Sequence, residues 1–172
     1  NTVELLYLSA PLHDVGKVGV ADAILLKPGK LTDEEFAEMK KHTTYGHDAL
    51  TGAEDKLGGN SFLMHAKEIA FRHHERWDGK GYPEGLGGED IPLSARLMAI
   101  ADVYDALISK RVYKPPFPHS KAVRIIAEGR GTQFDPLLTD AFLEIQEDFR
   151  RIALEFADFE EERAALMDDQ GE

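Results

Sequence analysis

The chain has 172 residues, 42% of them hydrophobic, and a formal net charge of −12 at pH 7. This length fits one domain with a substantial apolar core, and the acidic balance argues against binding to a nucleic-acid polymer, which requires a basic surface. The chain contains no cysteine, and we find no apolar run near the roughly 18 residues of a membrane span. We therefore expect a cytoplasmic protein without disulfides and with no membrane segment in this part.

The hydrophobic pattern predicts helices throughout, with no alternating strand pattern and no internal repeat. Residues Thr32–Glu35 form a capping box, and the helix that it starts is expected to carry Phe36 and Met39 on its inner face. Asp135 and Pro136 are typical of the N-cap and first residue of a long helix. The predicted helices cover about 3–12, which is expected to be buried, then 32–42, 61–73, a central helix over 93–109, and the segment from 136.

A long loop between two predicted helices is rich in glycine and proline. It covers residues 75–93, and loops of this length inside compact domains are usually functional. Residues 115–118 begin a second connector. Beyond Phe156 the sequence becomes acidic and heptad-like for a short stretch and then ends in a polar tail, which we expect to be solvated or frayed. The expected organisation is a main domain over residues 1–156 and an acidic helix end or tail over residues 157–172.

Imidazole and carboxylate side chains are concentrated at a few positions. These are His13, Asp14, His42, His73, His74 and Asp102. The intervals between them are about one helix plus one connector, so successive helices can direct ligands to a common centre. Such ligands suit manganese, iron or zinc, and the lack of thiolate argues against an iron–sulfur or structural zinc site. Two metals about 3.5–4 Å apart can clamp the attacking and leaving oxygens of a phosphoryl group, which predicts a metal-dependent phosphohydrolase.

Other interpretations of single histidines remain open. A His-Asp dipeptide at a helix end can also be an imidazole that faces the helix dipole beside a solvated carboxylate. We interpret His47, His65 and His119, which lie outside the motifs, as surface or core histidines. No arrangement typical of a serine or cysteine nucleophile and no glycine-rich phosphate loop is evident. Covalent catalysis and nucleoside-triphosphate-driven chemistry are therefore not expected.

The residues around the candidate ligands resemble those of the HD-GYP domain family. The matching stretches are His13–Lys17, Leu25–Thr32, Met39–Thr43 with Gly46, the run His73–Pro83 that contains the sequence GYP, Ile100–Leu107 and Gly131–Pro136. The similarity covers about residues 5–142, with the motifs in the family's order and spacing. It implies an all-α HD-superfamily helical bundle with a metal centre between helices and a long glycine-rich GYP loop.

The resemblance also implies the roles of individual residues. The implied metal ligands are His13, Asp14, His42, His73, His74 and Asp102. They would hold two divalent metal ions, with iron or manganese favoured over zinc, nickel or magnesium. Asp14 is expected to bridge the metals, and Lys17 to neutralise charge on the phosphoryl oxygens. Asp105, one helical turn after Asp102, is expected to support a ligand.

Three further residues are implied on the substrate side. In the family, the positions of Tyr82, Arg111 and Lys114 contact the cyclic dinucleotide. A tyrosine ring can stack on guanine or donate its hydroxyl to phosphate, and an arginine offers a planar fork for either group. An alternative for Arg111 and Lys114 is capping of the carbonyls at a helix end.

The activity implied by the resemblance is hydrolysis of the bacterial second messenger cyclic di-GMP to the linear dinucleotide pGpG, or onward to GMP. Two alternatives remain: an HD hydrolase of another phosphoester, such as a different cyclic dinucleotide, and a signalling module that binds partner proteins through the GYP loop. Because position 1 is asparagine, we expect a piece of a longer protein or a processed product. Expected partners are an N-terminal regulatory domain and either a second copy or a GGDEF-type protein. Family members usually carry another histidine upstream of the His-Asp pair, and this segment contains no such ligand.

Overall fold

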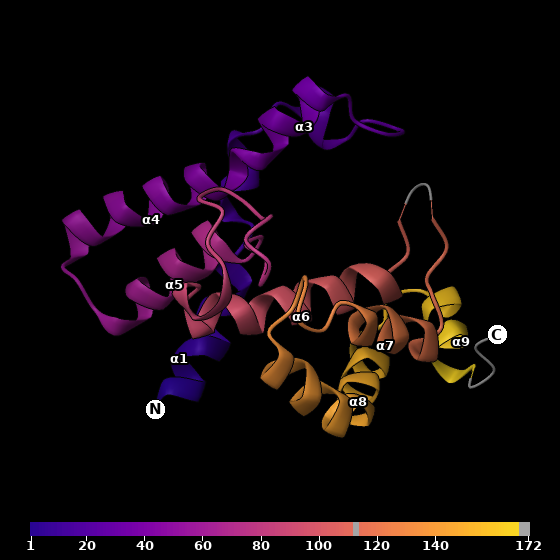
Figure 1. The fold of residues 1–172 in the computed structure, drawn as a ribbon. Helices are drawn as coiled ribbons and strands as arrows, with labels where there is room; N and C mark the ends of the chain where they lie inside the picture. Colours follow the sequence, from indigo (N-terminus) through magenta and orange to yellow (C-terminus); the bar gives the residue numbers. More distant parts are fainter. Residues whose placement is uncertain (112–113, 169–172) are drawn as a thin grey trace. The chain divides into compact units, whose positions relative to one another are not determined.

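The computed structural model describes residues 1–111 and 114–168. Within them the chain forms α-helices joined by loops and short 3₁₀ helices, with isolated backbone bridges and no sheet (Figure 1). The α-helices are α1 (Thr2–Ser9), α2 (Asp22–Leu25), α3 (Asp33–Lys40), α4 (His42–Leu57), α5 (Ser61–Arg72), α6 (Leu93–Ile108), α7 (His119–Glu128), α8 (Pro136–Phe156) and α9 (Glu160–Met167). The predicted all-α fold class is confirmed.

The chain divides into two compact units, Asn1–Met98 and Ala99–Glu172, and each is described by itself. The division falls within α6 and differs from the boundary predicted near residue 156, which remains a prediction. None of the helices in the described residues is both long and apolar enough to cross a lipid bilayer.

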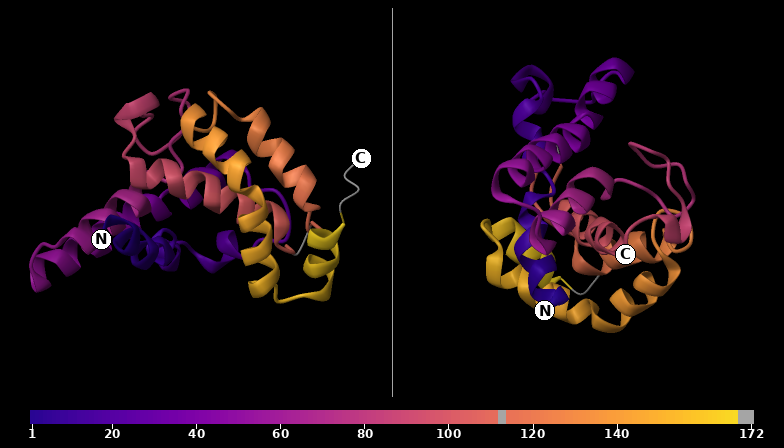
Figure 2. Two further views of the ribbon diagram at one scale, coloured as in Figure 1. Left: turned by 90° about the horizontal axis from the view of Figure 1, so that it is seen from below. Right: turned by 90° about the vertical axis from the view of Figure 1, so that its left-hand side faces the viewer.

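In the first unit, α4 and α5 lie side by side, and α1 also packs against α5 (Figures 1 and 2). Leu50 of α4 and Leu63, Ala66 and Ala70 of α5 form a small buried cluster. The 3₁₀ helix Val15–Gly19 packs closely on α4. This packing brings the segment after His13 and Asp14 against the start of α4.

Gly16 permits this close packing. A Cβ atom at Gly16 would lie 1.9 Å from the carbonyl oxygen of His42 and 2.3 Å from the backbone nitrogen of Gly46. Only a residue without a side chain can therefore let the two backbones meet. Because Asp14 is two residues before Gly16, the contact places Asp14 beside His42.

The second unit has an apolar core with aromatic rings at its centre. Tyr104 of α6 lies 5.8 Å from Phe142 and 5.4 Å from Phe149, both on α8, between ring centroids. The Tyr104 hydroxyl is 2.8 Å from Nδ1 of His119, a buried residue at the start of α7. His119 is thus a core residue, as interpreted from the sequence.

Several local predictions are confirmed. The side chain of Thr32 accepts from the amide of Glu35, and Glu35 accepts from the amide of Thr32, so α3 starts with the predicted capping box. Asp135 is the N-cap of α8, and its side chain accepts from the amide of Leu137. These signals depend on neighbouring residues only, which is why the sequence reveals them.

Predictions of burial were less accurate. The helix expected to be buried over residues 3–12 ends at Ser9, and Tyr7 is 79% exposed, because only one side of α1 meets α5. Phe36, expected on an inner face, is 46% exposed. After residue 156, residues 160–167 form α9, and the polar tail that was predicted to be solvated or frayed lies outside the described residues. Leu166 of α9 is buried in the core of the second unit, and Glu162 accepts from the amide of Lys110 at 2.7 Å.

Candidate metal centre

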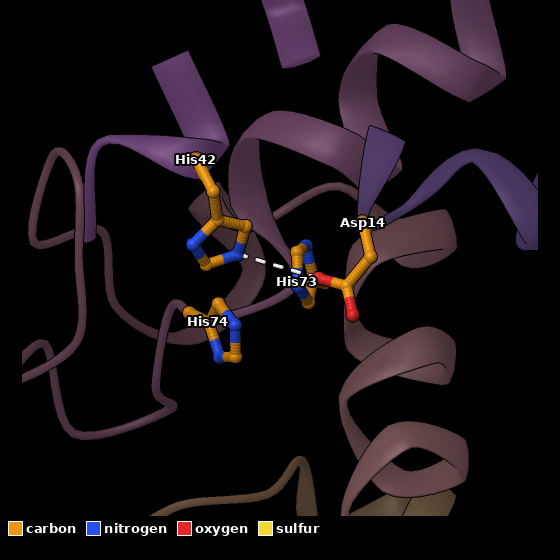
Figure 3. A group of neighbouring side chains, drawn as sticks. All are labelled: Asp14, His42, His73 and His74. Atoms are coloured by element: carbon orange, nitrogen blue, oxygen red, sulfur yellow. Dashed lines mark ion pairs between the residues drawn. The ribbon is translucent and has the colours of Figure 1, made fainter. Parts of the chain in front are cut away.

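Four side chains of the first unit meet at one point. Asp14, His42, His73 and His74 each offer a ligand atom, and these atoms all lie within 4.8 Å of one another. Figure 3 shows the four side chains directed toward a common space. Asp14 lies between two 3₁₀ helices, His42 is the first residue of α4, and His73 and His74 follow the end of α5. Three segments far apart in the sequence therefore build the cluster.

Backbone carbonyls orient the histidines. In His13, His42 and His73, Nδ1 lies within hydrogen-bond distance of a carbonyl oxygen three or four residues earlier. The distances are 2.8 Å for His13 to Ala10, 2.7 Å for His42 to Met39 and 2.8 Å for His73 to Ile69. Since a carbonyl oxygen can only accept, Nδ1 carries a proton in each of the three rings, and in neutral His42 and His73 the Nε2 atom therefore presents its lone pair. Metal-binding histidines are commonly held in this way.

Asp14 faces two of these lone pairs. Its Oδ1 atom lies 3.4 Å from Nε2 of His42 and 3.8 Å from Nε2 of His73. Oδ1 is buried and accepts no hydrogen bond from the described residues. Three acceptor atoms directed at one point repel one another unless a cation lies between them. The cluster therefore fits a divalent metal, whose ligands are carboxylate oxygens and neutral imidazoles.

The second oxygen of Asp14 faces a different set of groups. Oδ2 accepts a hydrogen bond from Nζ of Lys17 and lies 3.3 Å from Nε2 of His13. Burial raises the pKa of Asp14, but hydrogen bonds from His13 and Lys17 and the charge of Lys17 outweigh burial and hold this pKa well below its usual range. Asp14 is thus a carboxylate at neutral pH, with one oxygen directed to each side, as a bridging ligand requires.

The other predicted residues differ in how the structure places them. His13 lies beside Asp14 but outside the group of four, and Tyr82 stacks on His74 with ring centroids 4.8 Å apart. Asp102, Asp105, Arg111 and Lys114 belong to the second unit, so their part in this centre remains a prediction. Within that unit, Asp102 and Asp105 lie on α6, and two backbone hydrogen bonds of 3.1 Å join Arg111 and Lys114.

Glu75 organises the GYP loop through hydrogen bonds with its backbone amides. Its carboxylate accepts from the backbone amides of Glu84, Gly85 and Leu86 at 2.7, 3.2 and 2.9 Å. Glu75 is only 3% exposed. The signal in the sequence for this role is a carboxylate next to a glycine-rich loop, because the backbone amides of such a loop need hydrogen-bond acceptors. Arg76 and Asp78 form an ion pair at 2.8 Å, whereas Glu75 braces the loop through backbone amides.

Gly81 lets the loop fold back on the histidine doublet. A Cβ atom at this position would lie 2.5 Å from the carbonyl oxygen of His74 and 2.5 Å from the backbone nitrogen of Arg76. The amide of Tyr82 donates to the same carbonyl of His74 at 3.2 Å. The glycine of the GYP sequence is therefore required for close backbone packing, and this packing places the Tyr82 ring beside the cluster.

Comparisons with known proteins identify a family and several relatives of this chain. The family model described as HD domain matches residues 1–138. A cyclic di-GMP phosphodiesterase of Vibrio cholerae is 65% identical over 156 residues, which are 91% of this chain and 32% of that protein. One from Thermotoga maritima is 46% identical over 140 residues, 81% of this chain and 37% of that protein. A 3'3'-cGAMP-specific phosphodiesterase 2 of Vibrio cholerae is 44% identical over 158 residues, 92% of this chain and 29% of that protein. The chain thus spans about a third of the length of these curated relatives.

Proposed function

Because the chain belongs to the HD domain family and carries the HD-GYP motifs, we propose that it is a metal-dependent phosphodiesterase that hydrolyses cyclic di-GMP. The proposed product is pGpG, or GMP after a second step. The observation that carries the proposal is the convergence of the Asp14 carboxylate with the imidazoles of His42 and His73. Relatives named cyclic di-GMP phosphodiesterases support the choice of substrate.

We propose that the site holds two divalent metal ions, iron or manganese. When bound, such ions supply Lewis acidity and lower the pKa of a water for attack on phosphorus. The proposed ligands are His13, Asp14, His42, His73, His74 and Asp102. Support comes from the opposed directions of the two Asp14 oxygens and from the carbonyls that fix the imidazoles. Asp102 is included because of the resemblance alone, with Asp105 as its support.

Lys17 and Tyr82 act beside the metals in this proposal. Lys17 donates to Asp14, and its side chain is 40% exposed, so we propose that its ammonium group can also contact a phosphoryl oxygen of the substrate. There it would offset the negative charge that builds up during hydrolysis. Tyr82, fixed against His74, would position the substrate. Arg111 and Lys114 are proposed to bind a guanine edge or phosphate.

The cellular setting follows from the same proposal. We place the activity in the cytoplasm, where an N-terminal regulatory domain of the full protein would control it. A second copy or a GGDEF-type protein is the proposed partner at the GYP loop. The larger size of the curated relatives supports additional regions in proteins of this kind.

A different cyclic dinucleotide is the second candidate substrate. The relative named for 3'3'-cGAMP is 44% identical to this chain, whereas the cyclic di-GMP phosphodiesterase of Vibrio cholerae is 65% identical. The two substrates differ in one base and share the cyclic phosphodiester backbone, so a metal centre alone cannot separate them. We therefore favour cyclic di-GMP and include 3'3'-cGAMP in the test.

The test is turnover by protein purified without oxygen and supplied with Mn²⁺ or Fe²⁺. Cyclic di-GMP and 3'3'-cGAMP are assayed in parallel, and the products are separated by chromatography. The variants are Asp14→Ala and, as a matched control, Asp48→Ala, whose side chain is 69% exposed on α4. We expect pGpG or GMP from the unmutated protein and from Asp48→Ala but not from Asp14→Ala.

Two results would contradict the proposal. Faster turnover of 3'3'-cGAMP than of cyclic di-GMP would mean that 3'3'-cGAMP, and not cyclic di-GMP, is the substrate. A folded, metal-loaded protein that hydrolyses neither would favour the signalling module that binds partners without catalysis.

A further inference from the structure

An aromatic wall extends from the metal cluster to α3. Tyr82 stacks on His74 with centroids 4.8 Å apart and planes 24° from parallel. Phe36 of α3 meets Tyr82 edge-on, at 6.2 Å and 85°. One face of the Tyr82 ring is therefore covered by the imidazole of His74, and the ring of Phe36 lies close to Tyr82 as well.

Lys40, the last residue of α3, lies against this wall. Its Nζ atom is 5.3 Å from the ring centroid of Phe36 and 5.7 Å from that of Tyr82. Both distances are within the range of about 6 Å in which an aromatic face attracts a cation. Lys40 is half-buried, so part of its stem is covered while its charge is held beside the two rings.

The charge of Lys40 is not balanced by a carboxylate among the described residues. Other lysines of the same region are paired in this way: Lys17 with Asp14, Lys27 with Glu35, and Lys41 with Glu38. Lys40 and Lys41 are adjacent, yet only Lys41 has an acidic partner. A lysine held against aromatic rings without a carboxylate retains its capacity to bind an anion from solution.

The charge of the whole chain gives this position its importance. With a net charge of −12, the protein repels an anionic substrate at long range, so local cations must attract it. Two contacts link the metal cluster to Lys40, from His74 to Tyr82 and from Tyr82 to Lys40. A cyclic dinucleotide has a second phosphate one nucleotide away from the phosphate that is hydrolysed. A cation beyond the Tyr82 ring suits that second phosphate.

We propose that Lys40 is a further substrate-binding residue, whose ammonium group contacts the phosphate of the cyclic dinucleotide that is not being hydrolysed. Phe36 and Tyr82 position this ammonium group through their ring faces. The inference rests on the proposed function, because it assigns a contact to the same substrate in the same site. It adds a cation on α3 to Tyr82, Arg111 and Lys114, the substrate-side residues whose roles the resemblance implies.

The test compares Lys40→Gln with its neighbour Lys41→Gln. Steady-state kinetics with cyclic di-GMP should show a KM about tenfold higher for Lys40→Gln, the effect of losing one charge-assisted hydrogen bond, with kcat within about twofold. The KM of this variant should also depend less on salt concentration. Lys41→Gln removes the same charge one residue away and should keep the KM of the unmutated protein.

A substrate with a single phosphate separates this contact from general damage. Bis(p-nitrophenyl) phosphate lacks a second phosphate, so Lys40→Gln should hydrolyse it with an unchanged KM. An equal rise in KM for both substrates would overturn the inference. So would an unchanged KM of Lys40→Gln for cyclic di-GMP, and in that case the proposed function would stand.

Equilibrium binding keeps the test independent of turnover. Calorimetry of cyclic di-GMP with the metal-loaded proteins should show a dissociation constant about tenfold higher for Lys40→Gln. If the unmutated protein binds but does not hydrolyse, the proposed function fails while this comparison still decides the role of Lys40. Equal affinity of Lys40→Gln and the unmutated protein, including no binding by either, overturns the inference.

Discussion

The two compact units bury different kinds of side chain. In the first, His42 and His73 are almost fully buried, and the neighbouring apolar cluster consists of leucines and alanines. In the second, the interior contains the rings of Tyr104, Phe142 and Phe149. One unit thus holds polar groups in a fixed geometry, and the other gains stability from apolar contact area.

This difference shows what each unit requires from its sequence. Burying an imidazole is unfavourable unless it is hydrogen-bonded, and the backbone carbonyls of Met39 and Ile69 provide that bond. The same bonds direct the remaining nitrogens at Asp14. In the second unit, stability depends on how well rings fill space, and polar geometry matters mainly where Tyr104 meets His119. Substitutions in the two units should therefore affect different measurements.

The largest effect is expected from His73→Ala. Loss of this buried imidazole should remove several kcal/mol of metal-dependent transition-state stabilisation, which lowers kcat for cyclic di-GMP on the order of 10³-fold. Bound metal per folded chain, measured by mass spectrometry of the elements, should fall as well. His47→Ala removes a half-buried histidine outside the cluster and should retain both metal and activity. Retained metal and kcat in His73→Ala would contradict this assignment.

Phe142→Ala should have the largest effect on stability. Phe142 is 3% exposed, and its removal leaves a cavity among aromatic rings, at a cost of about 3–5 kcal/mol in the free energy of unfolding. Urea denaturation measures this change, and metal bound per folded chain should stay the same. Phe156→Ala, at a ring that is 73% exposed, is the control and should cost far less. Similar losses for both variants would show that the second unit is not packed as described.

Glu75→Gln should give an intermediate effect. The carboxylate accepts from three backbone amides, and the neutral amide side chain replaces charge-assisted hydrogen bonds by weaker ones, at a cost of about 1–3 kcal/mol. We expect faster hydrogen exchange at the amides of residues 84–86. Glu89→Gln changes an exposed glutamate of the same loop and should leave that exchange unaltered. Unchanged exchange in Glu75→Gln would mean that the loop has another support.

Asp78→Asn should produce the smallest effect, visible only in acid. The hydrogen bond from Arg76 lowers the pKa of Asp78 from 3.8 to about 2 in the folded chain. The contribution of the ionised Asp78 carboxylate to the free energy of unfolding is therefore complete above pH 3.8 and is lost as the pH falls through about 2. Between these values, the stability of Asp78→Asn should fall less steeply with pH than that of the unmutated protein, as measured by urea denaturation. Parallel curves would contradict the pairing with Arg76.

Local signals in the sequence predicted the starts of two helices well and burial poorly. The capping box at Thr32 and the N-cap at Asp135 involve residues within one turn, so they are visible in the sequence. The exposure of Phe36 and the burial of Leu166 depend on which elements pack against them. No local periodicity carries that information, because tertiary packing decides it.

The candidate site was predictable in its residue types and not in its geometry. His42, His73 and Asp14 were selected from their chemistry and from the resemblance, and the structure brings them together. The contacts that orient them depend on backbone positions: the carbonyls beside Nδ1, and the close approach at Gly16. Lys40 was not predicted as a site residue, because only its position beside two aromatic rings in the structure suggests a role for it.

The most direct test of the account is a titration of metal-free protein with Mn²⁺ or Fe²⁺ in which bound metal and cyclic di-GMP turnover are measured on the same samples. The account predicts that turnover is absent without metal and rises with occupancy, while His73→Ala neither gains metal nor becomes active. Turnover by metal-free protein, or full occupancy of a folded protein without any turnover, would contradict it.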